Sequence, residues 1–349
     1  MEAKKKKYCF YVIILSIFLF LCILASASVG SSSITIGDSF KVILSKIPII
    51  NNLIDTADIK EVYEVIIWKV RLPRILQASL VGGALAVVGC TFQAIFRNSL
   101  ADPHILGISS GASLGATLAI LSGITLNFFG LGITSIFAFV GAVLSVLLVY
   151  KIGCLGGQFM ITNLLLTGTA IGTMLSALIS LLMIYNREQL EKVYLWQLGS
   201  FSSANWNKVI FLTVISVICV TTIFMFGRDL NVILTGDDIA SSLGIDTVRL
   251  KNILILICAL LVASGVSVSG TIGFVGLIIP HCMKLLVGSD HRFLILFSYF
   301  GGAGFMVICD TIARTIAQPT EIPVGVITAV FGAPYFIYLL YRNTKSGRF

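Results

Sequence analysis

Long apolar runs separated by short polar segments dominate the chain, and the apolar residues are concentrated in these runs rather than alternating with polar ones. A helix needs about 20 apolar residues to cross the hydrocarbon core of a bilayer. On that length the sequence predicts ten membrane helices, near residues 8–30, 72–95, 105–123, 131–150, 161–184, 207–226, 250–269, 271–287, 293–312 and 323–341. Gly270 and Gly273 interrupt a nearly continuous run, which we interpret as two helices.

Small residues within the predicted helices indicate how the helices pack. Glycine lets helix backbones approach closely in lipid, and it also permits broken helices that line a cavity. We expect some broken helices for this reason. The cluster Gly107-Ile-Ser-Ser-Gly111-Ala-Ser-Leu-Gly115 goes further, because its density of Ser and Gly makes a face polar enough for water. We interpret this cluster as part of a translocation path.

The composition excludes a soluble protein. Of the 349 residues, 57% are hydrophobic and only 11% are charged, and the mean hydropathy is +1.01. Soluble domains are about a quarter charged, so this chain has too little polar surface to cover itself in water. The sequence therefore predicts an all-α polytopic membrane protein with a single transmembrane domain over residues 1–349. Soluble enzymes and nucleic-acid-binding domains are excluded.

The distribution of charge predicts the orientation. The net charge is +8, and an excess of Lys and Arg is typical of the cytoplasmic side of membrane proteins. Basic residues concentrate at both ends of the chain, in Lys4 to Lys7 and in residues 342–348. Ten helices then place both termini in the cytoplasm. Residues 31–71, nearly balanced in charge, are predicted to form an external segment.

The first apolar run also resembles a signal peptide, because Lys4 to Lys7 precede it and Ala25-Ser26-Ala27 follows it. The run is long for the apolar core of a signal peptide, and we favour a retained helix. In either case the segment after it begins outside.

Candidate chemistry is sparse. The sequence has no G-x-x-x-x-G-K-[ST] phosphate loop, so any ATP must be bound by another chain. The eight cysteines lie in or beside apolar runs without a C-x-x-C pair, and we predict no metal site and no disulfide. Asp310 and Arg314, four residues apart near the outer end of a helix, are able to pair. Glu321 begins the last predicted helix.

Two other classes of function fit the sequence less well. An ion-coupled secondary transporter needs a charge or an ion site in the middle of the membrane. A membrane-embedded enzyme needs a nucleophile and a base that converge. The sequence offers neither, so we predict no catalytic residues, and the ion-coupled secondary transporter is kept as the alternative function.

Several motifs resemble one family, in order, from about residue 70 to the C-terminus. They are Arg71-Leu-Pro73-Arg74, Arg97-Asn98-Ser99-Leu100-Ala101-Asp102-Pro103, Trp196-x-x-Gly199-Ser200, Gly270-Thr-Ile-Gly273-Phe274-Val-Gly276-Leu277, Pro280-His281, Asp310-x-x-x-Arg314, Glu321-x-Pro323-x-Gly325 and Gly332-Ala-Pro334. This set is similar to the FecCD family, the permease subunits of ABC importers for iron–siderophore complexes, haem and cobalamin. Ser99 departs from the family, which usually has proline there, and a missing proline frees an amide and relaxes φ.

The resemblance implies a cargo and partners. It implies a permease that moves an iron chelate (a siderophore complex, or haem or cobalamin) from an extracytoplasmic binding protein across the cell membrane of a prokaryote. It also implies a dimer with a second permease subunit, either identical or related, and two ATPase subunits on the cytoplasmic face. ATP and Mg²⁺ would belong to those ATPase subunits, and no cofactor is expected in this chain.

The resemblance also implies roles for residues at matching positions. Arg71, Arg74 and Arg314 match positions that pair with glutamates of the binding protein, for which the guanidinium fork is suited. From the residues alone, Arg71 and Arg74 equally suit anchors of a helix end at the membrane interface, and Arg314 suits a partner for Asp310.

On the cytoplasmic side, the loop 227–249 matches the segment that couples the permease to the ATPase subunits. Within it an acidic start and a glycine cap predict a short helix from Asp237 to Leu243, capped by Gly244. The residues that match the coupling element are Asp237, Asp238, Ile239, Ala240, Ser241, Leu243 and Gly244. A solvated loop is the simpler interpretation of the residues alone. Asn98, Leu100 and Thr162 match the cytoplasmic gate, where apolar or small side chains paired across a dimer axis exclude water.

Overall fold

The computed structural model describes residues 2–30, 34–46, 59–128, 130–154 and 161–345. Helices dominate this part of the chain, and they comprise α1 (Glu2–Ser28), α2 (Ile36–Ser45), α3 (Glu61–Val65), α4 (Leu72–Ile95), α5 (Ile108–Ser122), α6 (Ile133–Gly153), α7 (Ile161–Tyr185), α8 (Leu190–Gln197), α9 (Trp206–Met225), α10 (Gly227–Ile233), α11 (Asp237–Ser242), α12 (Thr247–Ser269), α13 (Val275–Val287), α14 (His291–Ala313) and α15 (Val324–Lys345). A π-helical turn spans Ile66–Arg71, and 3-10 turns span Pro103–Leu106 and Arg187–Gln189. The strands β1 (Asn127–Phe128) and β2 (Leu131–Gly132) pair antiparallel, with Asn127 opposite Gly132.

The predicted membrane helices are present. Within the described residues, eight helices are long and apolar enough to span a bilayer. The other two predicted spans correspond to the shorter apolar helices α5 and α13. The prediction of an all-α polytopic membrane protein is therefore confirmed.

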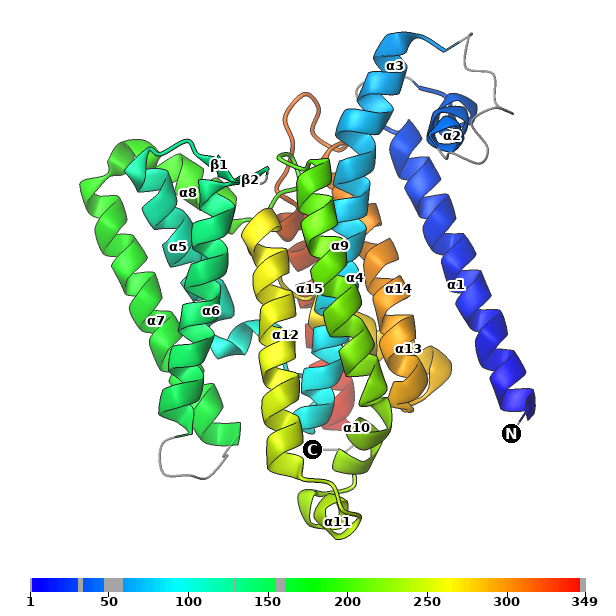
Figure 1. Ribbon diagram of the computed structural model, residues 1–349, viewed down its shortest axis with the longest axis vertical. Helices are drawn as coiled ribbons and strands as arrows, with labels where there is room; N and C mark the ends of the chain where they lie inside the picture. The colour runs from blue at the N-terminus through cyan, green and yellow to red at the C-terminus, as the bar shows by residue number, and fades with distance from the viewer. Residues whose placement is uncertain (1, 31–33, 47–58, 129, 155–160, 346–349) are drawn as a thin grey trace.

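Helix α4 runs through the centre of the main helix group (Figure 1). It contacts α9, α12, α13 and α14, and most of its side chains are buried. Helices α5, α6 and α7 form a second group beside it, which joins the first mainly where α6 meets α12. Helix α1 lies on the outside of the main group and packs against α14.

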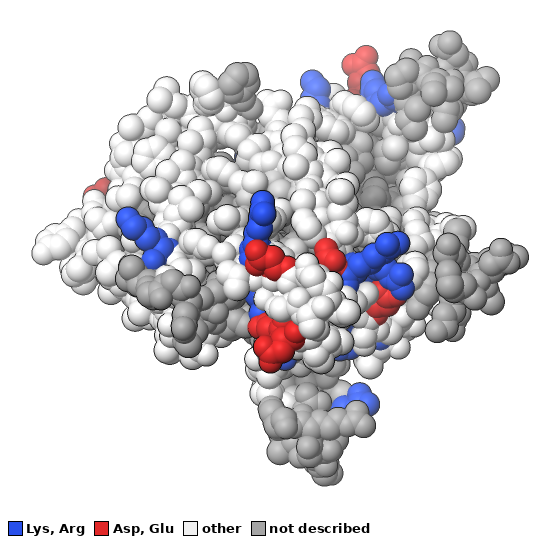
Figure 2. All heavy atoms as spheres, turned by 60° about the horizontal axis from the view of Figure 1, so that its bottom comes forward, with Lys and Arg blue, Asp and Glu red and all other residues white. Residues whose placement is uncertain are grey.

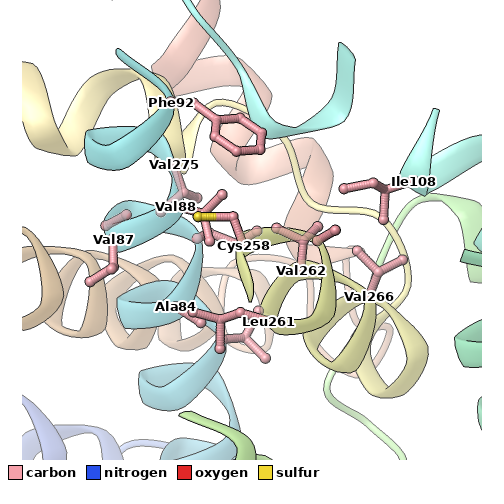
Figure 3. Close-up of a cluster of buried hydrophobic side chains, with 14 of the residues drawn as sticks. Ala84, Val87, Val88, Phe92, Ile108, Cys258, Leu261, Val262, Val266 and Val275 are labelled. Atoms are coloured by element: carbon pink, nitrogen blue, oxygen red, sulfur yellow. The ribbon is translucent and has the colours of Figure 1, made fainter. Parts of the chain in front are cut away.

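Apolar side chains of α4 pack against those of three other helices, α5, α12 and α13 (Figure 3). Val88 and Phe92 of α4 lie among residues of α12, α13 and α5 that are also buried, among them Cys258, Val262, Val275 and Ile108. At two crossings of α4 the backbones are closer than side chains allow. A Cβ atom on Gly89 would overlap the carbonyl of Gly276, and a Cβ on Gly82 would overlap the carbonyl of Gly302. Glycine is therefore required where α4 crosses α13 and α14.

The predicted break between α12 and α13 is also present. Gly270 ends α12 with φ +72°, and Phe274 precedes α13 with φ +70°. Left-handed backbone is unusual for a bulky residue such as phenylalanine. The extended stretch between the two helices brings the carbonyl of Ile272 within 2.8 Å of His104 Nε2.

One predicted boundary lies inside a helix. Residues 61–95 form a single continuous helix, so the last part of the predicted external segment 31–71 extends α4 beyond the expected membrane boundary. The π turn Ile66–Arg71 ends two residues before Pro73, which has no N–H and so removes a donor from the helix ladder. Residues 31–33 and 47–58 of that segment lie outside the described residues.

The two ends of the bundle differ in character. The cap end carries α2, α3, α8, the β1–β2 hairpin and the loop 314–323, whereas the α11 end carries α10, α11 and the first and last described residues of the chain (Figure 1). Acidic and basic side chains gather around α11, and most of the surface that surrounds them is uncharged (Figure 2).

Candidate functional site

The cap end holds a cluster of three arginines and two acids. Arg74 donates to both carboxylate oxygens of Asp310 at 2.8–3.0 Å and reaches Glu321 at 2.9 Å. Asp310 is only 1% exposed, whereas the side chain of Glu321 is 44% exposed. Arg74 therefore fastens α4 to α14 and to the loop before α15 through one buried and one exposed ion pair.

Arg71 and Arg314 tie the end of α1 to this cluster. Arg71 donates to the backbone carbonyls of Ala27 and Ser28 at 2.7 and 3.0 Å. Arg314 donates to the carbonyls of Ser26 and Val29 and to the Ser26 hydroxyl. Burial lowers the pKa of Arg314 to about 10, so its guanidinium remains charged at neutral pH.

The structure brings all three predicted docking arginines into one place. They line a cavity of about 490 Å³ together with Glu321 and part of the loop 314–323. The expected pairing of Arg314 with Asp310 is present at 3.7 Å, but Asp310 lies closer to Arg74. Arg71 and Arg314 are less than a tenth exposed, so both have a structural role as helix ties, and docking through them stays a prediction.

At the opposite end, the predicted short helix is present as α11. It begins at Asp237 after Gly236, ends at Ser242, and is followed by Gly244 with φ +86°. Ala240 is fully buried, but Ile239 and Leu243 are 50% and 66% exposed. Helix α11 and its C-cap Leu243 therefore present two apolar side chains outward, next to the acidic residues Asp237 and Asp238.

Asp237 links α11 to the helices behind it. Its carboxylate accepts from Lys251 of α12 at 2.8 Å and also pairs with Arg97, which follows α4. Burial raises the pKa of Asp237, but the hydrogen bond and charge of Lys251 and the charge of Arg97 outweigh this, so its pKa lies below the usual range. The sequence analysis missed Arg97 and Lys251 as partners, although both lie on the predicted cytoplasmic side.

The predicted gate residues lie at the α11 end. Asn98 and Leu100 are in the turn after α4, where Asn98 Oδ1 accepts from the amide of Leu100 at 2.9 Å. Thr162 is exposed in the first turn of α7. Ser99, the departure from the family pattern, is exposed in the same turn as Asn98. A gate formed by these residues across a dimer axis stays a prediction.

A second cavity at the cap end was not predicted. We call it the serine cavity, and its volume is about 590 Å³. It lies between α6, α8, α9 and the end of α12, and its polar lining comprises Thr134, Ser135, Lys192, Trp196, Ser200, Ser202, Ser203, Lys208, Ser267, Ser269 and Glu321. Lys208, in the first turn of α9, was not singled out because a single lysine at a helix end is common at a membrane interface.

The chain is similar to known proteins over almost its whole length. The sequence profile of the FecCD transport family matches residues 17–342. The chain belongs to the FecCD transport family. The match runs from within α1 to within α15 and includes the charged side chains at both ends of the bundle, so the resemblance predicted from the motifs is confirmed.

Individual members of the family agree with this assignment. An uncharacterised ABC transporter permease of Bacillus subtilis is 37% identical over 99% of this chain and 97% of its own length. The permease of a cobalamin import system of Halobacterium salinarum is 39% identical over 81% of this chain and 75% of its own length. A solved metal-chelate type ABC transporter in an inward-facing conformation has a TM-score of 0.81 at 33% identity, covering 95% of this chain and 99% of that one.

Family membership and the apolar helices together establish a location. The chain is a multi-pass protein of a prokaryotic inner membrane. FecCD relatives are transport permeases of the ABC class, so the family relationship supports a transport subunit and does not favour the ion-coupled alternative.

Proposed function

We propose that this chain is the membrane-spanning subunit of an ATP-driven importer for an iron chelate, with a siderophore complex as the first choice and haem or cobalamin as the others. Relatives are named as permeases for ferric citrate, hemin and cobalamin, which supports this range. The chain pairs with a second permease subunit and with two ATPase subunits that bind ATP and Mg²⁺. Hydrolysis on those subunits switches the pathway between outward-facing and inward-facing states.

The proposed orientation places the α11 end in the cytoplasm and the cap end outside. Both ends of the described chain lie at the α11 end (Figure 1), which agrees with the basic residues 4–7 and 342–348. The cap-end arginines then face the binding protein. A glutamate of that protein would enter the cavity lined by Arg71, Arg74 and Arg314, which hold one positive charge more than Asp310 and Glu321 neutralise.

The observation that carries the proposal is the exposed apolar tip of α11. Ile239 and Leu243 project from a short helix whose opposite side is buried through Ala240. An ATPase groove that covers these side chains would remove their apolar surface from water. Because Asp237 joins α11 to Arg97 and Lys251, a movement of α11 would act directly on the end of α4.

The same contact would connect the ATPase to the proposed gate. Arg97 immediately precedes Asn98 in the turn after α4, and Arg97 has a left-handed backbone with φ +49°. That conformation is uncommon for a residue other than glycine. A pull on Asp237 would therefore reach Asn98 through one side-chain pair and one peptide bond, and Leu100 through the hydrogen bond from its amide to Asn98 Oδ1.

Substitution of the α11 tip tests the proposal. We expect Ile239→Glu combined with Leu243→Glu to abolish copurification of the ATPase subunit encoded beside this chain, since carboxylates would replace the apolar contact. ATP-driven uptake should fall by at least about tenfold, the effect of losing roughly 1.4 kcal/mol of binding. The measurement is copurification from detergent followed by transport in proteoliposomes.

Ile239→Val is the matched control, because it keeps an apolar side chain at the same position. It should retain both ATPase binding and uptake. Undiminished ATPase binding by the double glutamate variant would rule out α11 as the coupling helix.

A further inference from the structure

The serine cavity has an unusual charge balance. Two lysines line it, Lys208 of α9 and Lys192 of α8. Its acidic residue is Glu321, whose carboxylate already pairs with Arg74 at 2.9 Å. In the described part of the chain, neither lysine forms an ion pair. The cavity therefore carries positive charge that its own walls do not neutralise.

Lys208 supplies the buried part of that charge. The residue is only 7% exposed. Its ammonium group donates to the backbone carbonyl of Ser203 at 2.8 Å and to the Ser203 hydroxyl at 2.7 Å. An ammonium has three donors, and these two acceptors are both neutral. A charge withdrawn from water without a counter-charge is costly, so an anion in the cavity would be favoured.

The rest of the lining suits oxygen atoms of a ligand. Hydroxyl groups come from two separate segments, from Ser135 of α6 and from Ser202 after α8, whereas Ser267 of α12 already donates its proton to the carbonyl of Ser264. Trp196 adds a flat apolar surface to the same cavity. Its volume of about 590 Å³ lies within the range of small-molecule sites. Hydrogen-bond donors around a buried ammonium are the usual means of holding carboxylates and other oxyanions.

We propose that the serine cavity is a cargo subsite for anionic oxygen groups, so that the chelate carried by this permease bears carboxylates or other negatively charged oxygens. The inference rests on the proposed importer function and narrows its cargo. Lys208 holds the anion from the buried side, Lys192 attracts it at the exposed side, and the serine hydroxyls complete its hydrogen bonds. The site takes up the anionic part of the cargo near the outer surface of the bundle.

A panel of cargoes distinguishes this inference from the proposed function. Proteoliposomes with the complete importer would be supplied with ATP and with one of four cargoes. Ferric citrate and haem carry negative charge, whereas ferrichrome and cobalamin carry no net negative charge. We expect uptake of a negatively charged cargo. Uptake of only the uncharged cargoes would leave the importer function intact and overturn the anion subsite. ATP-dependent uptake of none of the four would count against both.

Substitution of Lys208 then tests the residue itself. Lys208→Gln keeps a hydrogen-bond donor for Ser203 but removes the positive charge. The loop that contains Ser203 therefore stays bound to α9, whereas the anion loses its charged partner. We expect the KM for the anionic cargo to rise on the order of tenfold, because a hydrogen bond to a charged group is lost. Lys208→Arg should retain uptake, and Lys192→Gln, at the exposed rim, should raise KM less. An unchanged KM in Lys208→Gln would overturn the proposal.

Discussion

Replacing Asp310 by alanine should lower the free energy of unfolding by about 3–5 kcal/mol, the range found when one partner of a buried ion pair is removed. Asp310 is almost fully buried and is the shared partner of two arginines, with Arg74 at 2.8 Å and Arg314 at 3.7 Å. Without the carboxylate, two buried guanidinium groups repel each other, and Arg74 keeps only the exposed Glu321. The ties between α4, α14 and the end of α1 would weaken together. The measurement is SDS-induced unfolding of the purified chain in mixed micelles.

Glu321→Ala is the matched control for this prediction. It removes the other acid from the same Arg74, but Glu321 is 44% exposed. Exposed ion pairs contribute about 1 kcal/mol or less, so this variant should lose little stability. Equal losses in the two variants would contradict the idea that burial of Asp310 gives the cluster its strength.

Replacing Gly89 by alanine should be the most damaging single-methyl change in the helix bundle. The added Cβ would overlap the carbonyl group of Gly276, which belongs to the backbone of α13 and cannot rotate away. Overpacking of a tight core costs about 1–3 kcal/mol, and we expect the upper end of that range because backbone must move. Uptake should fall as well, since α13 directly follows the break at residues 270–274.

Gly265→Ala is the control for the glycine prediction. Gly265 also lies in a membrane helix, but its added Cβ would meet Val81 at an ordinary distance of 3.8 Å. Alanine is a better helix former than glycine by about 1 kcal/mol, so this variant should be neutral or slightly stabilised. If both variants behaved alike, the close crossing of α4 and α13 would not be a determinant of the fold.

Several features could be predicted from the sequence because they depend on local composition. Apolar length alone located the membrane helices, and the glycines at 270 and 273 marked the break between α12 and α13. The short helix α11 followed from its acidic start and its glycine cap. The extension of α4 back to Glu61 could not be predicted, because the charged residues of that segment placed it in the predicted external segment 31–71.

The pairings at the two ends of the bundle could not be predicted, because they join residues far apart in the chain. Arg74 and Asp310 are separated by 236 positions, and Arg97 and Asp237 by 140. The i,i+4 spacing of Asp310 and Arg314 pointed to the weaker of the two contacts that Asp310 makes. Similarly, the serine cavity depends on how α6, α8, α9 and α12 meet, and no single segment carries a motif for it.

The energy source is the central claim of this account, and it can be measured directly. The chain would be reconstituted in proteoliposomes with the ATPase and binding protein encoded beside it, and uptake of the panel of chelates would be followed with ATP inside or with an ion gradient alone. We predict uptake that requires ATP hydrolysis and does not respond to the gradient. Equal uptake without ATP, driven by the ion gradient, would contradict the importer and support a secondary transporter.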